Sequence, residues 1–246
     1  MKTIKENLRN LYSGKWKNLK SKIRKLDNPD DIHCPHLLST TDEFEKAWNQ
    51  SDIKMMIFGI RTNTWGIKDI SKDTIEDLMN LYEEFYFGGG NWKYAQTFWN
   101  YFYSIQELLK CRLNKKVSVI WNNVYKIENA PWDIENKYFN VTLEEVEIFR
   151  PNVILLLGLD ARYTLLSNIF GQSNLKVDDY WDDEKSLYSL NIDSLSIEPK
   201  IEPKIEPKIK KYLKKIIITY HPNARGESGI KMKYLIEHLS NELKSL

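Results

Sequence analysis

Four short apolar runs, each ending in a polar loop, constrain the fold of this chain more than any other feature. They are Ile53–Ile60, Val117–Asn123, Asn152–Gly158 and Ile216–Pro222. Runs of this length that end at Gly, Asn or Pro are typical of buried strands, and segments with apolar residues at helical spacing lie between them. The sequence therefore predicts an α/β fold: a three-layer α/β/α sandwich around a mostly parallel, roughly four-stranded sheet.

The first fifth of the chain differs from the rest. Residues 1–50 are helical in pattern, polar and basic, and we expect an N-terminal extension that precedes an α/β domain at residues 51–246. Thr41 is placed to cap a helix in this extension. Ser71 or Asp73 is placed to cap the helix that follows the first strand.

A perfect four-residue repeat, IEPKIEPKIEPK, occupies Ile197–Lys208. Proline at every fourth position is incompatible with a regular helix and with a central strand. Glutamate and lysine keep the segment polar. We therefore expect an extended insertion just before the fourth strand.

The charge of the chain gives little general information about partners. There are 36 basic and 34 acidic residues, a net charge of +2. Two basic stretches, Lys15–Lys25 and Lys208–Lys215, could meet phosphates or simply form solvated surfaces. No run of eighteen apolar residues is present, so we expect no membrane span.

The cysteines and histidines point to no metal centre. Cys34 and Cys111 are too few for a disulfide framework, which fits a reduced, cytoplasmic setting. His33, Cys34 and His36 form a tight cluster, but a fourth ligand with a recognisable spacing is missing. We predict no metal site and no cofactor.

Polar loops follow all four predicted strands. They read GIRTNTWG, then Asn122 and Asn123, then GLDAR, and finally HPNARG around His221. Parallel strands bring such loops to one edge of a sheet, where ligands bind in open α/β folds. An amide-rich edge with little acid suits an anionic ligand that carries a hydrogen-bonding heterocycle. Each residue alone has a simpler interpretation, since Asn and His-Pro also form ordinary turns and caps.

The order of these motifs resembles the uracil-DNA glycosylase superfamily. IFGIRTNTWG is similar to its first, Gly-rich motif, and VIWNNVYK to its strand that ends in asparagine. RPNVILLLG resembles another strand of the family, and TYHPNARG resembles its final His-Pro-Ser motif. The resemblance covers roughly residues 50–240. The iron-sulfur branch of the superfamily is excluded, because it needs four cysteines.

The resemblance implies a pocket that recognises a base extruded from DNA. Asn123 resembles the asparagine that reads the base edge, and its amide offers both a donor and an acceptor. Phe98 is the favoured residue for stacking on the base. Other aromatic candidates for stacking are Phe87, Trp92 and Trp99.

The same resemblance assigns the catalytic residues. His221 resembles the histidine that donates a hydrogen bond to the departing base, with Pro222 restricting its backbone. Ile60 and Arg61 stand where many relatives hold the attacking water with a carboxylate or an amide, and neither can act as a base. Asn63 could position the water instead. The candidate catalytic residues are therefore His221, Asn63 and Arg61.

Three further residues are expected to contact DNA. Arg225 lies in the loop that would fill the gap left by the extruded base. Asn223 replaces the family's serine after His-Pro. Lys126 follows the second strand and is predicted to meet phosphate.

The sequence thus predicts a DNA glycosylase that excises a damaged, deaminated or modified base and leaves an abasic site. DNA is the expected partner and a monomer the expected state. The altered loop at Arg61 and Asn63 argues against assuming uracil, so a hypermodified base of a phage genome is an option, with a role in defence rather than repair. Two alternatives stay open: a catalytically lapsed nucleic-acid or nucleotide-binding module, and a hydrolase of free nucleosides.

Overall fold

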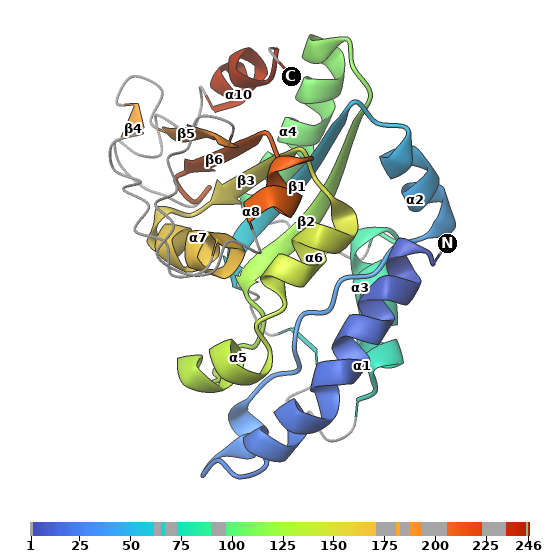
Figure 1. The fold of residues 1–246 in the computed structure, drawn as a ribbon, viewed down its shortest axis with the longest axis vertical. Helices are drawn as coiled ribbons and strands as arrows, with labels where there is room; N and C mark the ends of the chain where they lie inside the picture. Colours follow the sequence, from blue (N-terminus) through green and yellow to red (C-terminus); the bar gives the residue numbers. More distant parts are fainter. Residues whose placement is uncertain are drawn as a thin grey trace.

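The computed structural model describes residues 2–61, 65–66, 73–89, 97–170, 181–182, 187–192, 206–222, 235–244 and 246. In this part of the chain, six strands form one sheet in the order β2-β1-β3-β6-β5-β4. Helices cover both faces of the sheet, with α6 and α8 in front of it and α4 behind it in Figure 1. The predicted three-layer α/β/α sandwich is confirmed.

The four central strands are parallel and correspond to the four apolar runs. They are β1 (Ile53–Arg61), β2 (Val117–Tyr125), β3 (Val153–Leu157) and β6 (Lys215–Thr219). β1 lies between β2 and β3, and β6 pairs with the other side of β3. The side chains from Met55 to Phe58 are fully buried, because both faces of β1 are covered. All four strands end at the same edge of the sheet, so their polar loops start there.

Two strands were not expected from the sequence. β5 (Leu187–Asn191) pairs antiparallel with β6, and β4 (Trp181–Asp182) pairs antiparallel with β5. Each is short, and β5 alternates apolar and polar residues only weakly. Their pairing with β6 therefore decides their conformation, and local propensity contributes little.

The helices form two layers because successive side chains of β2 point to opposite faces of the sheet. Trp121 faces α3 and α4, where the Trp99 ring lies 4.8 Å away and the Tyr82 hydroxyl donates to the Trp121 carbonyl oxygen at 2.7 Å. Asn122 faces the opposite layer, which contains α6. The described α-helices are α1 (Ile4–Ile23), α2 (Asp42–Asn49), α3 (Ile75–Tyr86), α4 (Thr97–Leu113), α5 (Trp132–Tyr138), α6 (Thr142–Phe149), α7 (Arg162–Phe170), α8 (Glu206–Lys210) and α10 (Leu235–Leu243). None of them combines the length and apolar character needed to cross a membrane.

Local side chains fix where two of these helices begin. Thr41 caps α2, as predicted, because its hydroxyl accepts a hydrogen bond from the Phe44 N–H at 3.2 Å. The cap of α3 is Thr74 and not one of the two residues expected from the sequence. Thr74 Oγ1 accepts from the Asp77 N–H at 3.1 Å, and Asp77 Oδ2 accepts from the Thr74 N–H at 2.9 Å. This reciprocal capping box satisfies two backbone donors, whereas the Thr74 hydroxyl alone would satisfy one.

The N-terminal helix is part of the common core, although the sequence marks residues 1–50 as an extension. Leu8, Tyr12, Leu19 and Ile23 of α1 are fully buried in the same hydrophobic cluster as the sheet. Several basic residues of α1 have partners within the protein: Lys15, for example, forms an ion pair with Glu144 of α6 at 2.7 Å. This part of the basic stretch therefore serves packing within the protein.

The end of the Ile197–Lys208 repeat differs from the predicted extended insertion. Residues 206–208 form the start of α8, whereas residues 193–205 lie outside the described residues. Pro207 falls in the first turn, where a missing N–H breaks no helical hydrogen bond. The repeat therefore permits a helix to begin at its last unit.

A buried ion pair lies beneath the carboxyl end of β2. Lys126 Nζ is 2.7 Å from Glu145 Oε2 of α6, and their side chains are 1% and 0% exposed. The ammonium also donates to Asn122 Oδ1, and Asn122 Nδ2 donates to Glu145 Oε2 at 3.0 Å. Tyr12 of α1 donates to the other carboxylate oxygen at 2.7 Å. Burial lowers the pKa of Lys126, while the charge of Glu145 raises it. The network joins β2, α6 and α1 without leaving either charge unpaired.

Removal of one partner should be costly. Lys126→Met leaves the Glu145 carboxylate buried without its cation, so we expect a loss of about 3–5 kcal/mol in the free energy of unfolding. Adding Glu145→Gln removes the remaining charge and should recover part of that loss. Urea denaturation checks both variants.

The matched control is the exposed pair Lys110–Glu107 on α4, whose charged atoms lie 3.0 Å apart. Lys110→Met should cost less than about 1 kcal/mol, because water screens the pair. Equal costs for Lys110→Met and Lys126→Met would contradict the importance of the buried pair.

Candidate functional site

Three predicted site residues meet around Gly59, near the carboxyl edge of the sheet. Gly59 of β1 is the register partner of Asn123 of β2. A Cβ atom at Gly59 would lie 2.7 Å from Asn123 Oδ1 and 3.4 Å from the Phe98 ring. On its other side, the Phe98 ring stacks on the imidazole of His221 at 6.0 Å and 26°. The absence of a side chain at position 59 thus lets the Asn123 amide and the Phe98 ring approach one another, and the imidazole of His221 joins them through its contact with Phe98.

The amide of Asn123 has unused hydrogen-bonding capacity. The residue is 1% exposed, and its Nδ2 has no hydrogen-bond partner among the described residues. A buried amide that lacks an acceptor costs about 1–3 kcal/mol, so native proteins rarely keep one without a reason. An acceptor on a ligand would satisfy it.

The backbone at Asn123 is fixed by its neighbour. Asn122 Oδ1 accepts the Asn123 N–H at 2.7 Å as well as the Lys126 ammonium. The buried ion pair therefore holds Asn122 on one face of β2, and Asn123 points to the other face. Because side chains alternate along a strand, Asn122 is held by the ion pair on one face, while the Asn123 amide is left available on the other.

His221 is half-buried after the end of β6, and Pro222 beside it is buried. Burial lowers the pKa of the His221 imidazole. The neutral ring predominates at pH 7, since its ordinary pKa is already about 6.5. A neutral imidazole offers one N–H donor and one acceptor.

A second group of unsatisfied nitrogens lies in the aromatic layer behind this site. His36 is fully buried among Trp65, Tyr82 and Trp121, with ring centroids 4.4 to 5.4 Å away. Neither ring nitrogen of His36 has a hydrogen-bond partner in the described part, nor do the indole nitrogens of Trp65 and Trp121. Burial and, second, the charge of Lys126 lower the pKa of His36 well below its ordinary value. His36 is therefore a neutral core residue.

Arg61 lies one register pair beyond Gly59 and Asn123. It is exposed, it pairs with Tyr125 in the sheet, and its guanidinium carbon sits 5.2 Å from the centre of the Tyr125 ring. A guanidinium cannot accept a proton, so Arg61 is placed to contact an anion and not to activate water. Asn63, Asn223 and Arg225 lie outside the described residues.

Lys126 does not occupy the surface position that the sequence predicts for a DNA contact. Its side chain is 1% exposed, and its ammonium is bound to Glu145 and Asn122. Reaching a phosphate would require breaking a buried ion pair. The structure therefore replaces the predicted DNA contact with a structural role.

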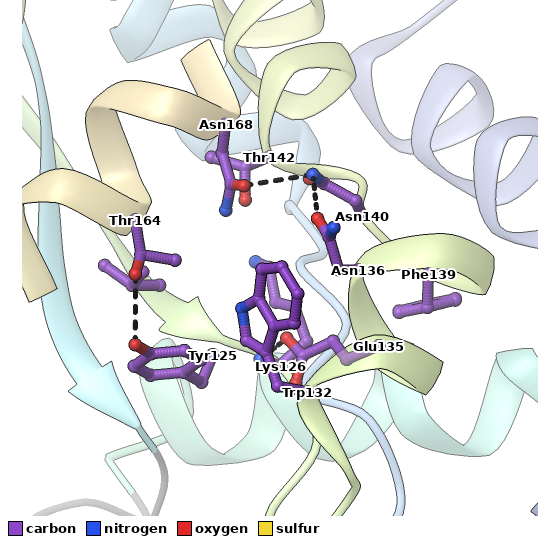
Figure 2. Close-up of a pocket in the computed structure, with 11 residues that line it drawn as sticks. Tyr125, Lys126, Trp132, Glu135, Asn136, Phe139, Asn140, Thr142, Thr164 and Asn168 are labelled. Carbon is purple, nitrogen blue, oxygen red and sulfur yellow. Dashed lines mark hydrogen bonds between the residues drawn. The ribbon is translucent and has the colours of Figure 1, made fainter. Parts of the chain in front are cut away.

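A small cavity adjoins the same edge of the sheet, between β2, α5, α6 and α7. Its volume is about 20 Å³, enough for one water molecule. Figure 2 shows the Trp132 ring standing across this cavity, with amide side chains on one side and the bonded pair Tyr125 and Thr164 on the other. Glu135 lies below, and its carboxylate accepts the backbone N–H groups of Lys126 at 2.5 Å and Ile127 at 3.3 Å. Burial raises the pKa of Glu135, and these hydrogen bonds lower it.

A larger groove of about 1320 Å³ lies at the opposite, amino-terminal edge of the sheet. Lys54, Arg150, Lys208 and Lys211 line it, together with glutamates. It includes part of the second basic stretch. Its position separates it from the cluster around Gly59.

The side chains of the His33, Cys34 and His36 cluster have partners other than a metal ion or are packed in the core. His33 Nδ1 lies 3.2 Å from the Trp65 carbonyl oxygen, and Cys34 Sγ donates to Asp73 Oδ2 at 3.2 Å. Within the described ranges, no group of three or more His, Cys, Asp or Glu side chains could hold a metal ion.

Glu145 was not among the candidate residues in the sequence analysis, although the spacing around it is informative. Thr142, Glu145, Val146 and Phe149 are all buried at intervals of three and four residues. That period places Glu145 on the apolar face of α6, and a carboxylate on such a face needs a buried partner. The signal was present, but the partner Lys126 could not be identified without the tertiary structure.

Comparison of the chain with known protein families, with curated proteins and with solved structures finds no match.

Gly59→Ala tests the close approach at the candidate site. The added Cβ would meet Asn123 Oδ1 at 2.7 Å, so the amide has to rotate or β1 has to move. We expect a loss of about 1–3 kcal/mol in the free energy of unfolding. Gly14, whose added Cβ would meet nothing within 4 Å, is the matched control. Calorimetric unfolding of both alanine variants checks this, and equal stabilities would contradict it.

The buried His36 should make stability depend on pH. Below about pH 6.5 the unfolded chain protonates this histidine, whereas the folded protein does not. The unfolded state then binds more protons, so stability falls as the pH drops, by at most about 1.4 kcal/mol per pH unit. His36→Phe should reduce the slope measured by urea denaturation between pH 7.5 and pH 5. An unchanged slope would show that His36 titrates normally.

Proposed function

We propose that the protein is a DNA glycosylase that hydrolyses the N-glycosidic bond of a damaged, deaminated or modified nucleotide. The observation that supports it best is the buried Asn123 amide: its Nδ2 has no partner in the described part, and its Oδ1 lies against Gly59, as does the Phe98 ring. A base edge provides an acceptor for that donor, and an aromatic ring provides a stacking surface for the base. The resemblance of the four strand-end motifs to the uracil-DNA glycosylase superfamily adds to this.

In the proposed reaction, the target nucleotide leaves the DNA stack and its base enters the site at the carboxyl edge. Phe98 stacks on the base, and the Asn123 amide hydrogen-bonds its edge. The bond between C1′ and the base nitrogen then breaks, and its electron pair leaves with the base. His221, neutral at pH 7, donates its N–H to the base oxygen on which negative charge develops. Water adds its oxygen to C1′ and keeps one proton in the new hydroxyl group, and its other proton passes to the departing base.

Neither of the residues predicted to handle the attacking water can act as a general base. Arg61 stays protonated and stacks on Tyr125, so it does not act as a base. Asn63 remains the proposed residue that orients water, since an amide can align a water molecule but cannot take its proton. Stabilisation of the leaving base by His221 therefore supplies most of the rate enhancement in this scheme.

The lack of a base at Arg61 also favours a second candidate function. A fold of this type without water activation would bind a base, a nucleotide or nucleic acid and catalyse nothing.

If the protein is a glycosylase without a base to activate water, it would act best on bases that leave easily, which includes deaminated and hypermodified bases. Excision of phage-modified bases would place the protein in antiviral defence, and excision of deaminated bases in repair.

Base release from defined duplexes tests the proposal. Duplexes carrying uracil, deaminated purines or modified cytosines are incubated with the protein, and abasic sites are then cleaved with alkali. We expect strand breaks on at least one duplex. His221→Ala removes the donor to the leaving base and should lower the rate about 10²- to 10³-fold. Asn123→Asp removes the amide donor and should abolish release.

His238→Ala is the matched histidine control, because His238 lies on α10 and should leave the rate unchanged. No breaks on any duplex, together with salt-sensitive DNA binding, would favour the binding module. Release of bases from free nucleosides alone would favour a nucleoside hydrolase.

A further inference from the structure

Two exposed aromatic rings lie at the same edge of the sheet as the candidate site. Among the described residues, the exposed large hydrophobic side chains are Trp132, Tyr163 and Leu246, at 62%, 49% and 38%. Both aromatic residues follow a strand end: Trp132 begins α5 after β2, and Tyr163 lies in the first turn of α7 after β3. Single exposed rings are common, but two at one functional edge are a reason to look for a ligand.

The two rings are connected through the residues between them. Tyr125, at the end of β2, bonds through its hydroxyl to Thr164 Oγ1 of α7 at 3.1 Å. Tyr125, Thr164 and Trp132 line the same small cavity, as Figure 2 shows. Tyr163 precedes Thr164 on α7. We call Arg61, Tyr125, Trp132, Arg162 and Tyr163 the aromatic rim.

Each tyrosine of the rim carries an arginine on its face. The guanidinium carbon of Arg162 is 4.3 Å from the centre of the Tyr163 ring, and that of Arg61 is 5.2 Å from the Tyr125 ring. A guanidinium that lies on a ring still directs N–H groups outward from its edge, where a phosphate can accept them. Arg162 uses part of this capacity within the protein, since its Nη1 donates to the Leu159 carbonyl oxygen at 3.0 Å and its Nη2 to the Tyr163 hydroxyl at 3.3 Å.

The surface of the aromatic rim consists mainly of aromatic and uncharged polar side chains and carries little net positive charge. Asp133 and Asp160 are exposed beside Trp132 and Arg162, so the two arginines are partly offset. The wall behind Trp132 consists of amides: Asn140 Nδ2 donates to Asn136 Oδ1 at 3.2 Å and to Asn168 Oδ1 at 3.0 Å. A protein-docking patch would present an apolar centre, whereas stacked rings with amides and two arginines suit unpaired bases joined by phosphates.

The rim also continues the candidate site. Gly59 pairs with Asn123, and the next register pair, two residues further along both strands, is Arg61 with Tyr125, whose hydroxyl turns toward α7 at the end of the sheet. Two residues along a strand span about 7 Å, roughly one nucleotide step away. A strand whose target base occupied the Asn123 site would therefore pass over Tyr125 and toward Trp132.

We propose that the aromatic rim binds single-stranded DNA, with bases stacked on Trp132 and Tyr163 and phosphates held by Arg61 and Arg162. The proposal deepens the proposed function, on which it rests for the identity of the nucleic acid. Single-stranded DNA is then the form of substrate that binds at this edge of the sheet. Affinity comes from stacking more than from charge.

Binding of a labelled thymidine 12-mer, followed by fluorescence anisotropy, tests the proposal without any excisable base. We expect the single strand to bind more tightly than the same sequence in a duplex. Trp132→Leu should weaken binding at least about fivefold, since base stacking on an aromatic ring is worth that much or more. Trp132→Phe should recover most of the loss, because it restores a ring. Tyr163→Leu should weaken binding in the same direction.

Salt dependence tests the two arginines. Two phosphate contacts to a single strand predict a slope of log K against log salt of about −1.4, and Arg162→Met should reduce it by about 0.7. Trp16 of α1 is the matched control, because it also lies beneath a cation, with Lys20 Nζ 5.3 Å from its ring. Trp16→Leu should leave the affinity unchanged.

Three results would overturn the proposal: no binding of the single strand, wild-type binding by both Trp132→Leu and Tyr163→Leu, or an equal loss in Trp16→Leu. The outcome is independent of catalysis because the 12-mer has no target base. If the protein releases a base but does not bind the single strand, only the proposal for the aromatic rim is wrong. If the rim binds the single strand but no duplex loses a base, only the proposed glycosylase activity is wrong.

Discussion

The buried ion pair between Lys126 and Glu145 is the interaction on which the candidate site depends. It joins the end of β2 to α6, and Tyr12 adds α1 to the same carboxylate. Two charges removed from water are stable only when both are paired and hydrogen-bonded, and here Asn122 and Tyr12 complete that requirement. The arrangement fixes the last residues of β2 in one position. The N-terminal helix is consequently part of the domain that presents the site.

Because side chains alternate along β2, the ion pair that holds Asn122 also determines where the Asn123 amide points. Asn122 points into the network, and Asn123, one residue later, points toward Phe98 on the opposite face. Successive side chains of a strand point to opposite faces of the sheet, so the position of Asn122 determines the face on which Asn123 lies. Gly59 then provides the space that the amide and the ring share. The result is a rigid donor that finds no acceptor among the described residues, a preorganised state that favours binding of a ligand.

Electrostatics at this edge differ from those of a strongly basic DNA-binding surface. Lys126, the one residue with an ammonium among the predicted DNA contacts, is paired with Glu145 in the core, and the cations of the rim, Arg61 and Arg162, lie on tyrosine rings. His221 is uncharged at neutral pH because burial lowers its pKa. Recognition through neutral donors and aromatic surfaces suits bases more than phosphates. The basic groove at the opposite edge of the sheet is lined by other residues and is separate from this chemistry.

The sequence by itself determined the parallel sheet and the edge at which its polar loops meet, because β1, β2, β3 and β6 are continuous apolar runs that only burial on both faces explains. The resemblance of its strand-end motifs to the uracil-DNA glycosylase superfamily also placed Asn123, Phe98 and His221 among the candidates. Only the tertiary structure decided that Lys126 is buried, that Thr74 caps α3, and that β4 and β5 extend the sheet beyond β6. The physical reason is that these outcomes depend on partners distant in the chain. A lysine after a strand is expected to be a surface charge until α6 brings Glu145 to it, and a short segment without a clear strand pattern becomes a strand when a sheet edge offers it hydrogen bonds.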